Sequence, residues 1–272
     1  SRHFHVYTGS GLSFDIMTDR AFDIAACRYK DTPLAWISPS GWMHPAYYES
    51  DGLGWLRSFQ GGLCTTCGLD QIGAPSEDGG EAFGIHGRIS STPAEQVRHR
   101  SWWDGESYRL EVSGQMRQAR LFGENLVLQR HISTEMGSTR ILLEDTVTNL
   151  GFVPQPHLIL YHCNLGFPLV SEHTRLVVDV EETVPRDADA VVGLDQWSEF
   201  QAPTPGYSEQ VFRHVPRADD DGKVNVRVEN HALGLGMRIS FYKQQLPHLV
   251  EWKMMGQGAY VLGIEPSNST GI

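Results

Sequence analysis

Two apolar stretches of this sequence end in side chains that can move protons at neutral pH. The first covers residues 156–161 and is followed by His162, with Asn164 two positions further on. The second covers residues 259–264 and is followed by Glu265. Each stretch is typical of a buried strand, which holds a side chain at its end rigidly. Because imidazole and carboxylate groups are common general acids and bases, we expect His162 and Glu265 to face each other across a pocket.

Each of these residues also has a purely structural interpretation. A histidine at the end of a buried strand is often a core group that only satisfies a backbone carbonyl. A carboxylate is almost never fully buried without a partner, so Glu265 either forms a salt bridge with an arginine or faces a cavity. Asn164 would project to the same side of its strand as His162, and both could hydrogen-bond one ligand.

A second group of candidates lies in residues 38–95, which are rich in glycine, proline and aromatic residues and show no regular period. Such a long irregular segment is usually disordered or a binding surface, and its aromatic content favours loops folded over one face of a sheet. Within it, His86 is followed by Gly87, and Arg57 could grip ligand oxygens; both are equally compatible with ordinary surface positions. The aromatic residues that could stack on a sugar, or simply belong to a core, are Trp42, Tyr47, Tyr48, Trp55 and, later, Trp197.

The surrounding elements read as strands. Apolar and polar residues alternate with period two in several stretches, and turn residues separate them at roughly ten-residue intervals, which is typical of antiparallel sheets. These stretches are 12–16, 108–113, 126–132, 140–148, 223–229 and 236–242. Residues 183–222 are looser, and no long amphipathic helix or internal repeat is found. We therefore predict an all-β fold, a large antiparallel β-sandwich with few short helices, as a single domain over residues 1–272.

Composition narrows the function classes. The chain has 272 residues, with 22 Lys and Arg against 33 Asp and Glu, and its net charge of −11 argues against nucleic acid as a partner. No apolar run approaches the ~18 residues of a membrane span, and the first residues lack the apolar segment of a signal peptide. Cys27, Cys64, Cys67 and Cys163 read as free structural thiols, which fits a cytoplasmic protein. We expect no metal and no cofactor, because the known ligand spacings and phosphate-binding motifs are missing; a homodimer stays open.

Several of these motifs together resemble the aldose 1-epimerase, or galactose mutarotase-like, superfamily, and most nearly its DUF4432 branch. The resemblance extends from about residue 11 to residue 265. Its landmarks are residues 19–24, 58–63, 84–88, 149–154, 161–164 and 264–266. It implies the galactose mutarotase-like supersandwich fold and a cofactor-independent isomerase of free sugars. Since chains of the superfamily normally continue through a last strand, it also implies either that a C-terminal strand is missing or that this edge of the sheet is closed in another way.

The resemblance also implies residue roles. His86 would bind the sugar, His162 would be the general acid and Glu265 the base. Arg57, 29 residues before His86, would bind sugar hydroxyls. Glu209 stands where the superfamily has an acidic residue that contacts the sugar.

Lys253 is a further candidate for substrate binding, and the sequence leaves open which of Glu209, Gln210 and Lys253 points into the pocket. We expect an isomerase that interconverts the anomers of a free sugar by acid–base ring opening and closure. One alternative is a carbohydrate-binding or sensing protein without turnover. Another is a lyase or hydrolase, which would need a second carboxylate or a tyrosine base such as Tyr161 or Tyr207.

Overall fold

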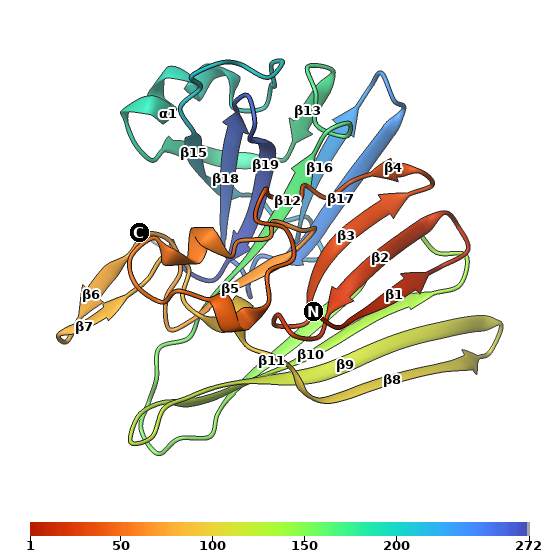
Figure 1. Cartoon of the computed structure of the whole chain (residues 1–272). Coiled ribbons are helices and arrows are strands. Elements are labelled where there is room, and N and C mark those ends of the chain that lie inside the picture. Colours follow the sequence, from red (N-terminus) through yellow and green to blue (C-terminus); the bar gives the residue numbers. More distant parts are fainter. Residues whose placement is uncertain (271–272) are drawn as a thin grey trace.

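The computed structural model describes residues 1–270 and consists mostly of antiparallel strands (Figure 1). The largest sheet has six strands in the order β14-β15-β18-β19-β12-β5. Their bounds are β5 Thr65–Leu69, β12 Leu158–Gly166, β14 Val180–Pro185, β15 Gln210–Pro216, β18 His248–Met255 and β19 Tyr260–Ser267. The two strands expected to hold the acid–base pair, β12 and β19, are therefore neighbours in one sheet.

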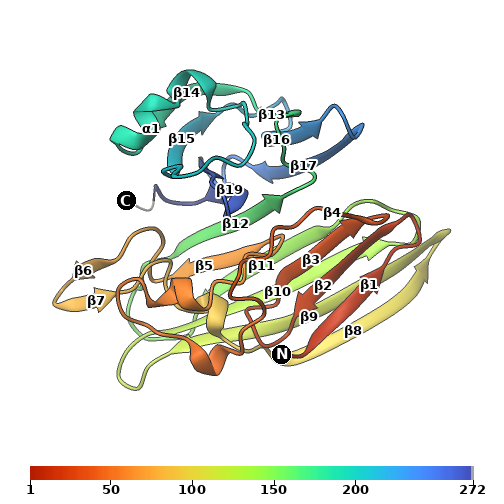
Figure 2. The ribbon, with the colours of Figure 1, turned by 45° about the horizontal axis from the view of Figure 1, so that its top comes forward.

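Two four-stranded sheets pack against each other (Figure 2). The first follows the chain order and consists of β1 His3–Tyr7, β2 Leu12–Met17, β3 Asp23–Tyr29 and β4 Thr32–Pro33. The second has the order β11-β10-β9-β8, with β8 Glu95–Asp104, β9 Ser107–Ala119, β10 Asn125–Glu135 and β11 Leu142–Asn149. Their facing side chains belong to one continuous apolar core, which includes Phe14 from β2 and Met116 from β9.

The remaining elements are small. A three-stranded sheet contains β13 Thr174–Val177, β16 Lys223–Asn230 and β17 Leu235–Tyr242, and a hairpin contains β6 Ser76–Asp78 and β7 Glu81–Phe83. The one α-helix, α1, covers Ala188–Val192 among the described residues 1–270. The 3-10 helices are η1 Pro45–Tyr47, η2 Gly54–Arg57, η3 Ile89–Ser91 and η4 Leu194–Gln196. The prediction of an all-β sandwich with few short helices is confirmed.

The burial pattern explains which strands can hold a site. In β16 buried and less buried residues alternate, as in a strand with one covered face. In β12 and β19 nearly every residue is buried, because both faces of the central sheet are covered. The main core covers one face, and a smaller cluster built on Trp55, Phe59, Ile72 and Leu160 covers the other. The irregular segment before β8 thus lies over one face of the sheet, as expected.

Two further findings concern the cysteines and the helices. All four cysteines are buried free thiols, which fits their structural interpretation. No helix within residues 1–270 is long and apolar enough to span a membrane.

Candidate active site

His162 and Glu265 lie beside each other on β12 and β19. The strands are antiparallel with Cys163 opposite Ile264, so the register brings His162 opposite Glu265. The atoms His162 Nε2 and Glu265 Oε1 are 3.2 Å apart. Both residues are only 4% exposed. The structure therefore forms a buried histidine–carboxylate pair on two strands covered on both faces.

Aromatic rings surround the imidazole of His162. The ring centroids of Phe59 and Trp252 lie 5.2 and 5.5 Å from that of His162. Trp55 stacks on Phe59 at 4.3 Å and contacts the ring of His86 at 4.7 Å. The rings form an apolar wall beside the pair, and such a wall excludes water and strengthens the electrostatic interactions inside the site.

His86 reaches this cluster from a tight turn. Its backbone has φ 60°, and its ring centroid is 5.5 Å from that of His162. A side chain on Gly87 would lie 2.4 Å from the carbonyl oxygen of Gly68, so the turn requires glycine there. The backbone N–H of Gly73 donates to His86 Nδ1 at 3.3 Å; because Nδ1 accepts, a neutral ring has its proton on Nε2. Burial lowers the pKa of His86 to about 4, so this ring is a neutral donor near pH 7.

Asn164 anchors the strand next to the pair. Its Nδ2 donates to the carbonyl oxygens of His162, at 2.8 Å, and Gly62, at 3.1 Å. Asn164 Oδ1 and His162 Nδ1 are both buried, and neither has a hydrogen-bond partner within residues 1–270. Buried polar atoms are nearly always hydrogen-bonded, so these two are available to a ligand.

The pKa values of the pair are shifted so that both groups are neutral. Burial raises the pKa of Glu265 to about 8, and the nearby charge of Glu209 adds to the shift. Burial and the neighbouring His86 lower the pKa of His162 well below its ordinary value, against the opposing effect of Asn164. Low-dielectric surroundings disfavour the charged form of each group. Near pH 7 the pair therefore holds one titratable proton, which lies on Glu265.

An exposed polar network leads from the surface to this pair. Trp252 Nε1 donates to Glu209 Oε2 at 2.8 Å, and Arg186 Nη2 donates to Glu209 Oε1 at 2.9 Å. Arg186 also lowers the pKa of Glu265, partly offsetting burial. Glu209 is exposed and Trp252 only partly buried, so Trp252 separates the acid–base pair from solvent on this side.

Two of the predicted substrate-binding residues lie apart from the pair. The side chain of Arg57 is 74% exposed, and its Nε is 3.3 Å from Glu49 Oε2. Trp42 is 40% exposed and packs edge-on against His3 at 5.8 Å. In the part of the chain that the structure describes, neither side chain hydrogen-bonds to the pair or stacks on it.

Lys253 and Gln210 face the opposite side of the sheet. Adjacent strand residues point to opposite faces, and Trp252 contacts His162, so Lys253 projects away from the pair. Lys253 Nζ instead donates to the carbonyl oxygen of Gln196 at 2.8 Å. Glu209 accepts a hydrogen bond from Trp252 and therefore lies on the same side of the sheet as the pair. The structure thus groups His86, His162, Asn164, Glu209 and Glu265, but not Lys253.

Sequence reasoning missed Phe59, Trp252 and Arg186. Phe59 belongs to the motif at residues 58–63, but nothing in the motif indicates that its ring reaches His162. Trp252 could have been found from the sequence as the residue directly before Lys253 in a strand, because neighbouring strand residues point to opposite faces of the sheet. The role of Arg186 depends on a contact with Glu209 between distant segments, which no local pattern indicates.

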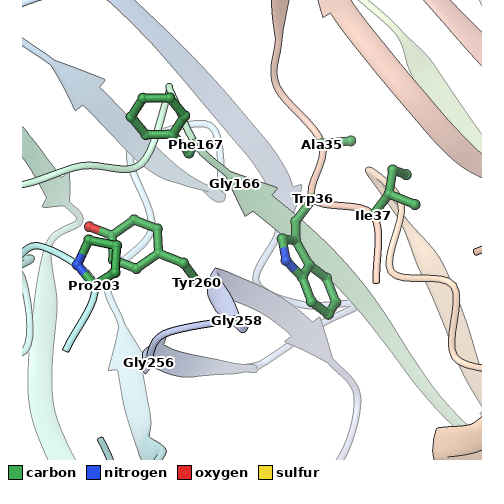
Figure 3. Close-up of a pocket in the computed structure, with 9 residues that line it drawn as sticks. All are labelled: Ala35, Trp36, Ile37, Gly166, Phe167, Pro203, Gly256, Gly258 and Tyr260. Carbon is green, nitrogen blue, oxygen red and sulfur yellow. The ribbon is translucent and has the colours of Figure 1, made fainter. Parts of the chain in front are cut away.

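A cavity of about 330 Å³ lies beside the aromatic cluster (Figure 3). Its lining residues are Ala35, Trp36, Ile37, Gly166, Phe167, Pro203, Gly256, Gly258 and Tyr260. Trp36 is shared with the cluster, because its ring centroid is 6.0 Å from that of Phe59 and 6.1 Å from that of Trp252. The cavity reaches the aromatic wall, but His162 and Glu265 do not line it.

Within residues 1–270, no group of three or more His, Cys, Asp or Glu side chains is arranged to hold a metal ion.

Stacked antiparallel sheets with these strands form the galactose mutarotase-like β-sandwich fold, which solved structures share with this chain. A family model described as a domain of unknown function, DUF4432, matches residues 1–272, and the chain belongs to this family. The resemblance inferred from the sequence motifs is confirmed. No curated protein matches the chain.

Three solved structures show how far the likeness extends. A provisionally assigned aldose 1-epimerase from Klebsiella pneumoniae is 28% identical with a TM-score of 0.93, and the match covers 98% of this chain and 71% of that one. A galactose mutarotase related enzyme from Lactobacillus acidophilus is 10% identical, with a TM-score of 0.62 and 99% and 89% of the two chains covered. An aldose epimerase homologue from C. elegans is 12% identical, with a TM-score of 0.59 and coverages of 98% and 89%. The last two show the fold alone.

Proposed function

We propose that this protein is an aldose 1-epimerase-like isomerase that interconverts the anomers of a free sugar. The observation that supports this most is the buried His162–Glu265 pair, whose nearest atoms are 3.2 Å apart. His86, a neutral hydrogen-bond donor, lies beside it. The likeness to the Klebsiella pneumoniae structure, which is itself described as an aldose 1-epimerase only provisionally, adds support.

The reaction follows from the two groups. Glu265, as the carboxylate, removes the proton from the anomeric hydroxyl, while His162, as the imidazolium, donates a proton to the ring oxygen. The ring opens to the aldehyde, the C1–C2 bond rotates, and ring closure with reversed proton transfers gives the other anomer. Each turnover returns the pair to its starting protonation state, so the reaction needs one proton in the pair.

The location of that proton changes when the sugar binds. In the sugar-free site burial favours the proton on Glu265. Hydrogen bonds from sugar hydroxyls to Glu265 stabilise its charged form, and transfer across the 3.2 Å to His162 then leaves the net charge of the pair unchanged. The neutral pair is thus one short proton transfer away from the reactive carboxylate and imidazolium.

Access of the sugar requires a side-chain movement, because the pair is only 4% exposed. Trp252 is partly exposed, and its indole N–H is bonded to the exposed carboxylate of Glu209. We therefore assign the entrance to this side, where rotation of Trp252 would uncover His162 and leave Glu209 free to bind sugar hydroxyls.

The decisive experiment is exchange NMR of anomeric protons over a panel of free aldoses. Wild type is expected to accelerate exchange for at least one sugar, and His162→Asn and Glu265→Gln are each expected to reduce that acceleration about 100-fold or more, because each removes a general acid or base. The exposed residues His131 and Glu106, changed to Asn and Gln, serve as matched controls and should leave the rate unchanged.

Two outcomes would contradict the proposal. If no sugar exchanges faster with wild type but some sugars bind, and binding survives both substitutions, the protein is a binding module and the pair is structural. If exchange is accelerated but persists in both variants, other residues catalyse the reaction.

The pH dependence of anomer exchange is a second test. The active site needs one proton in the pair, and with a pKa of about 8 for Glu265 that proton is lost above about pH 8. On the acid side a second proton binds only well below the ordinary histidine pKa. The value of kcat/KM is therefore expected to be flat near neutral pH and to fall above about pH 8. A rate that kept rising through that region would show that the unprotonated pair is the active form.

A further inference from the structure

A second buried histidine–carboxylate pair lies on the opposite face of the six-stranded sheet. His214 Nε2 on β15 is 3.0 Å from Glu251 Oε2 on β18, and both side chains are fully buried. His214 Nδ1 is 2.9 Å from Thr183 Oγ1, and the ring of Trp197 packs on the imidazole at 4.8 Å. Glu251 Oε1 has no hydrogen-bond partner within residues 1–270. This pair anchors a polar region that the proposed isomerase reaction does not use.

Lys253 lies two positions after Glu251 and so faces the same side of β18. The residue is 3% exposed, and its Nζ donates to the carbonyl oxygen of Gln196 at 2.8 Å and lies 5.5 Å from the ring centroid of Phe200. An ammonium group has three donors. In the described chain Lys253 makes no direct ion pair with a carboxylate, so a buried cation is left with unused donors.

Lys253 lines a cavity of about 420 Å³. Most of the wall comes from the segment that contains α1 and η4 and the loop after it, and it includes residues with hydroxyl and amide side chains, some of which hydrogen-bond to one another. These groups belong to Gln196, Gln201, Thr204, Tyr207, Ser208 and Gln210. Among the described residues that line the cavity, Lys253 is the only cation and Asp189 the only carboxylate.

A purely structural role for Lys253 does not account for this arrangement. Glu251 already has His214 as its hydrogen-bonding partner, and a lysine that only filled space would be replaced by an apolar residue at no cost. Burial lowers the pKa of Lys253, and the more distant charges of Glu251 and Glu199 oppose that effect. A bound anion in contact with Nζ would supply a direct counter-charge, which neither Glu251 nor Glu199 provides at ion-pair distance.

We propose that this cavity binds a small polyhydroxylated monocarboxylate, a sugar acid, with the carboxylate on Lys253 and the hydroxyls on the surrounding amides and hydroxyls. The cavity volume is in the range of small-molecule sites. The hydrogen-bonding walls fit a hydroxyl-rich ligand, and the single ammonium fits one negative charge. This site is separate from the His162–Glu265 pair and does not depend on the proposed isomerase function.

Isothermal titration calorimetry with D-gluconate tests this proposal, and D-glucose serves as the uncharged comparison. Wild type is expected to bind one gluconate per chain, at least tenfold more tightly than glucose. Lys253→Gln, which keeps a donor for the Gln196 carbonyl, should weaken gluconate binding at least tenfold because it removes a charge-assisted hydrogen bond. Gln201→Leu, a change at an exposed wall residue that leaves the buried cluster intact, should weaken it severalfold.

His162→Asn is the control for the location of the site, and it should bind gluconate as wild type does. The proposal is overturned if wild type binds no gluconate at millimolar concentration. It is equally overturned if Lys253→Gln or Gln201→Leu binds it as tightly as wild type, or if only His162→Asn loses binding, which would place gluconate at the acid–base pair. Circular dichroism is used to check that each variant is folded. If Lys253→Gln does not fold, Gln201→Leu still tests the proposal.

Discussion

Replacing Arg130 with methionine is expected to lower the free energy of unfolding by about 3–5 kcal/mol, because it removes the cation from a fully buried charge network. Arg130 Nη1 donates to Asp23 Oδ1 at 2.9 Å. Its Nε and Nη2 donate to the two oxygens of Asp145 at 2.8 and 2.6 Å. Without the guanidinium, two buried carboxylates would lose the cation that they contact directly. One of them, Asp23, would keep hydrogen bonds from neutral donors, among them the hydroxyl of Thr66 at 2.6 Å, and the more distant charge of Arg20.

The network matters because it joins strands from all three large sheets. Arg130 is on β10, Asp23 on β3 and Asp145 on β11, and Thr66 on β5 belongs to the six-stranded sheet. Tyr161 on β12 donates its hydroxyl to Asp145 Oδ2 at 2.8 Å. Tyr161 directly precedes His162, so loss of Arg130 should also loosen the strand that positions the proposed general acid.

Urea denaturation of Arg130→Met measures the effect as a lower midpoint with an unchanged slope. The loss should be larger at pH 7 than at pH 4, because burial raises the pKa of Asp23 and protonation removes its uncompensated charge at low pH. Arg117→Met is the matched control, because Arg117 is on neighbouring β9 and makes only an exposed contact with Asn125; its effect should stay within about 0.5 kcal/mol. An Arg130→Met variant as stable as wild type would show that the carboxylates are satisfied without the guanidinium.

The fold was predictable wherever one face of a strand is buried. Alternation predicted strands at residues 126–132 and 223–229, which lie inside β10 and β16. It could not predict β8, because nearly every side chain of that strand is exposed and no alternation results. It also left residues 183–222 loose, although β15 forms there, since its neighbours in the sheet, β14 and β18, are needed to show which face is inward.

The pairing of His162 with Glu265 was predictable for a related reason. His162 and Glu265 each end an apolar stretch, and a polar group so placed is notable in the sequence alone. The aromatic wall was not predictable, because it depends on which strand lies beside β19 and on how the irregular segment folds back. The same limit explains why the sequence left open whether Lys253 points into the pocket. Because Lys253 directly follows Trp252 in β18, their side chains point to opposite faces of the sheet. The sequence does not show which of these faces carries His162 and Glu265.

Glu265→Gln is expected to make the protein more stable while abolishing anomer exchange. The Glu265 pKa is about 8 in the folded protein against an ordinary value of 4.5. Below pH 4.5 the carboxyl is protonated in both states, so it has no pH-dependent effect. Between pH 4.5 and 8 the unfolded chain releases this proton and the folded protein keeps it, so the free energy of unfolding falls as pH rises. Above pH 8 both states are ionised and the loss is complete.

Glutamine has nearly the shape of glutamate but does not ionise, so the free energy of unfolding of the variant does not fall between pH 4.5 and 8. At pH 8 its free energy of unfolding should exceed that of wild type by on the order of 3 kcal/mol, and near pH 4 the two should be similar. Chemical denaturation across this pH range measures the difference, with Glu106→Gln as the exposed control that shows no such trend. A difference independent of pH would mean that the carboxyl titrates normally in the folded protein. The expected result would show that burial of the Glu265 carboxyl lowers the free energy of unfolding near neutral pH and keeps this carboxyl protonated.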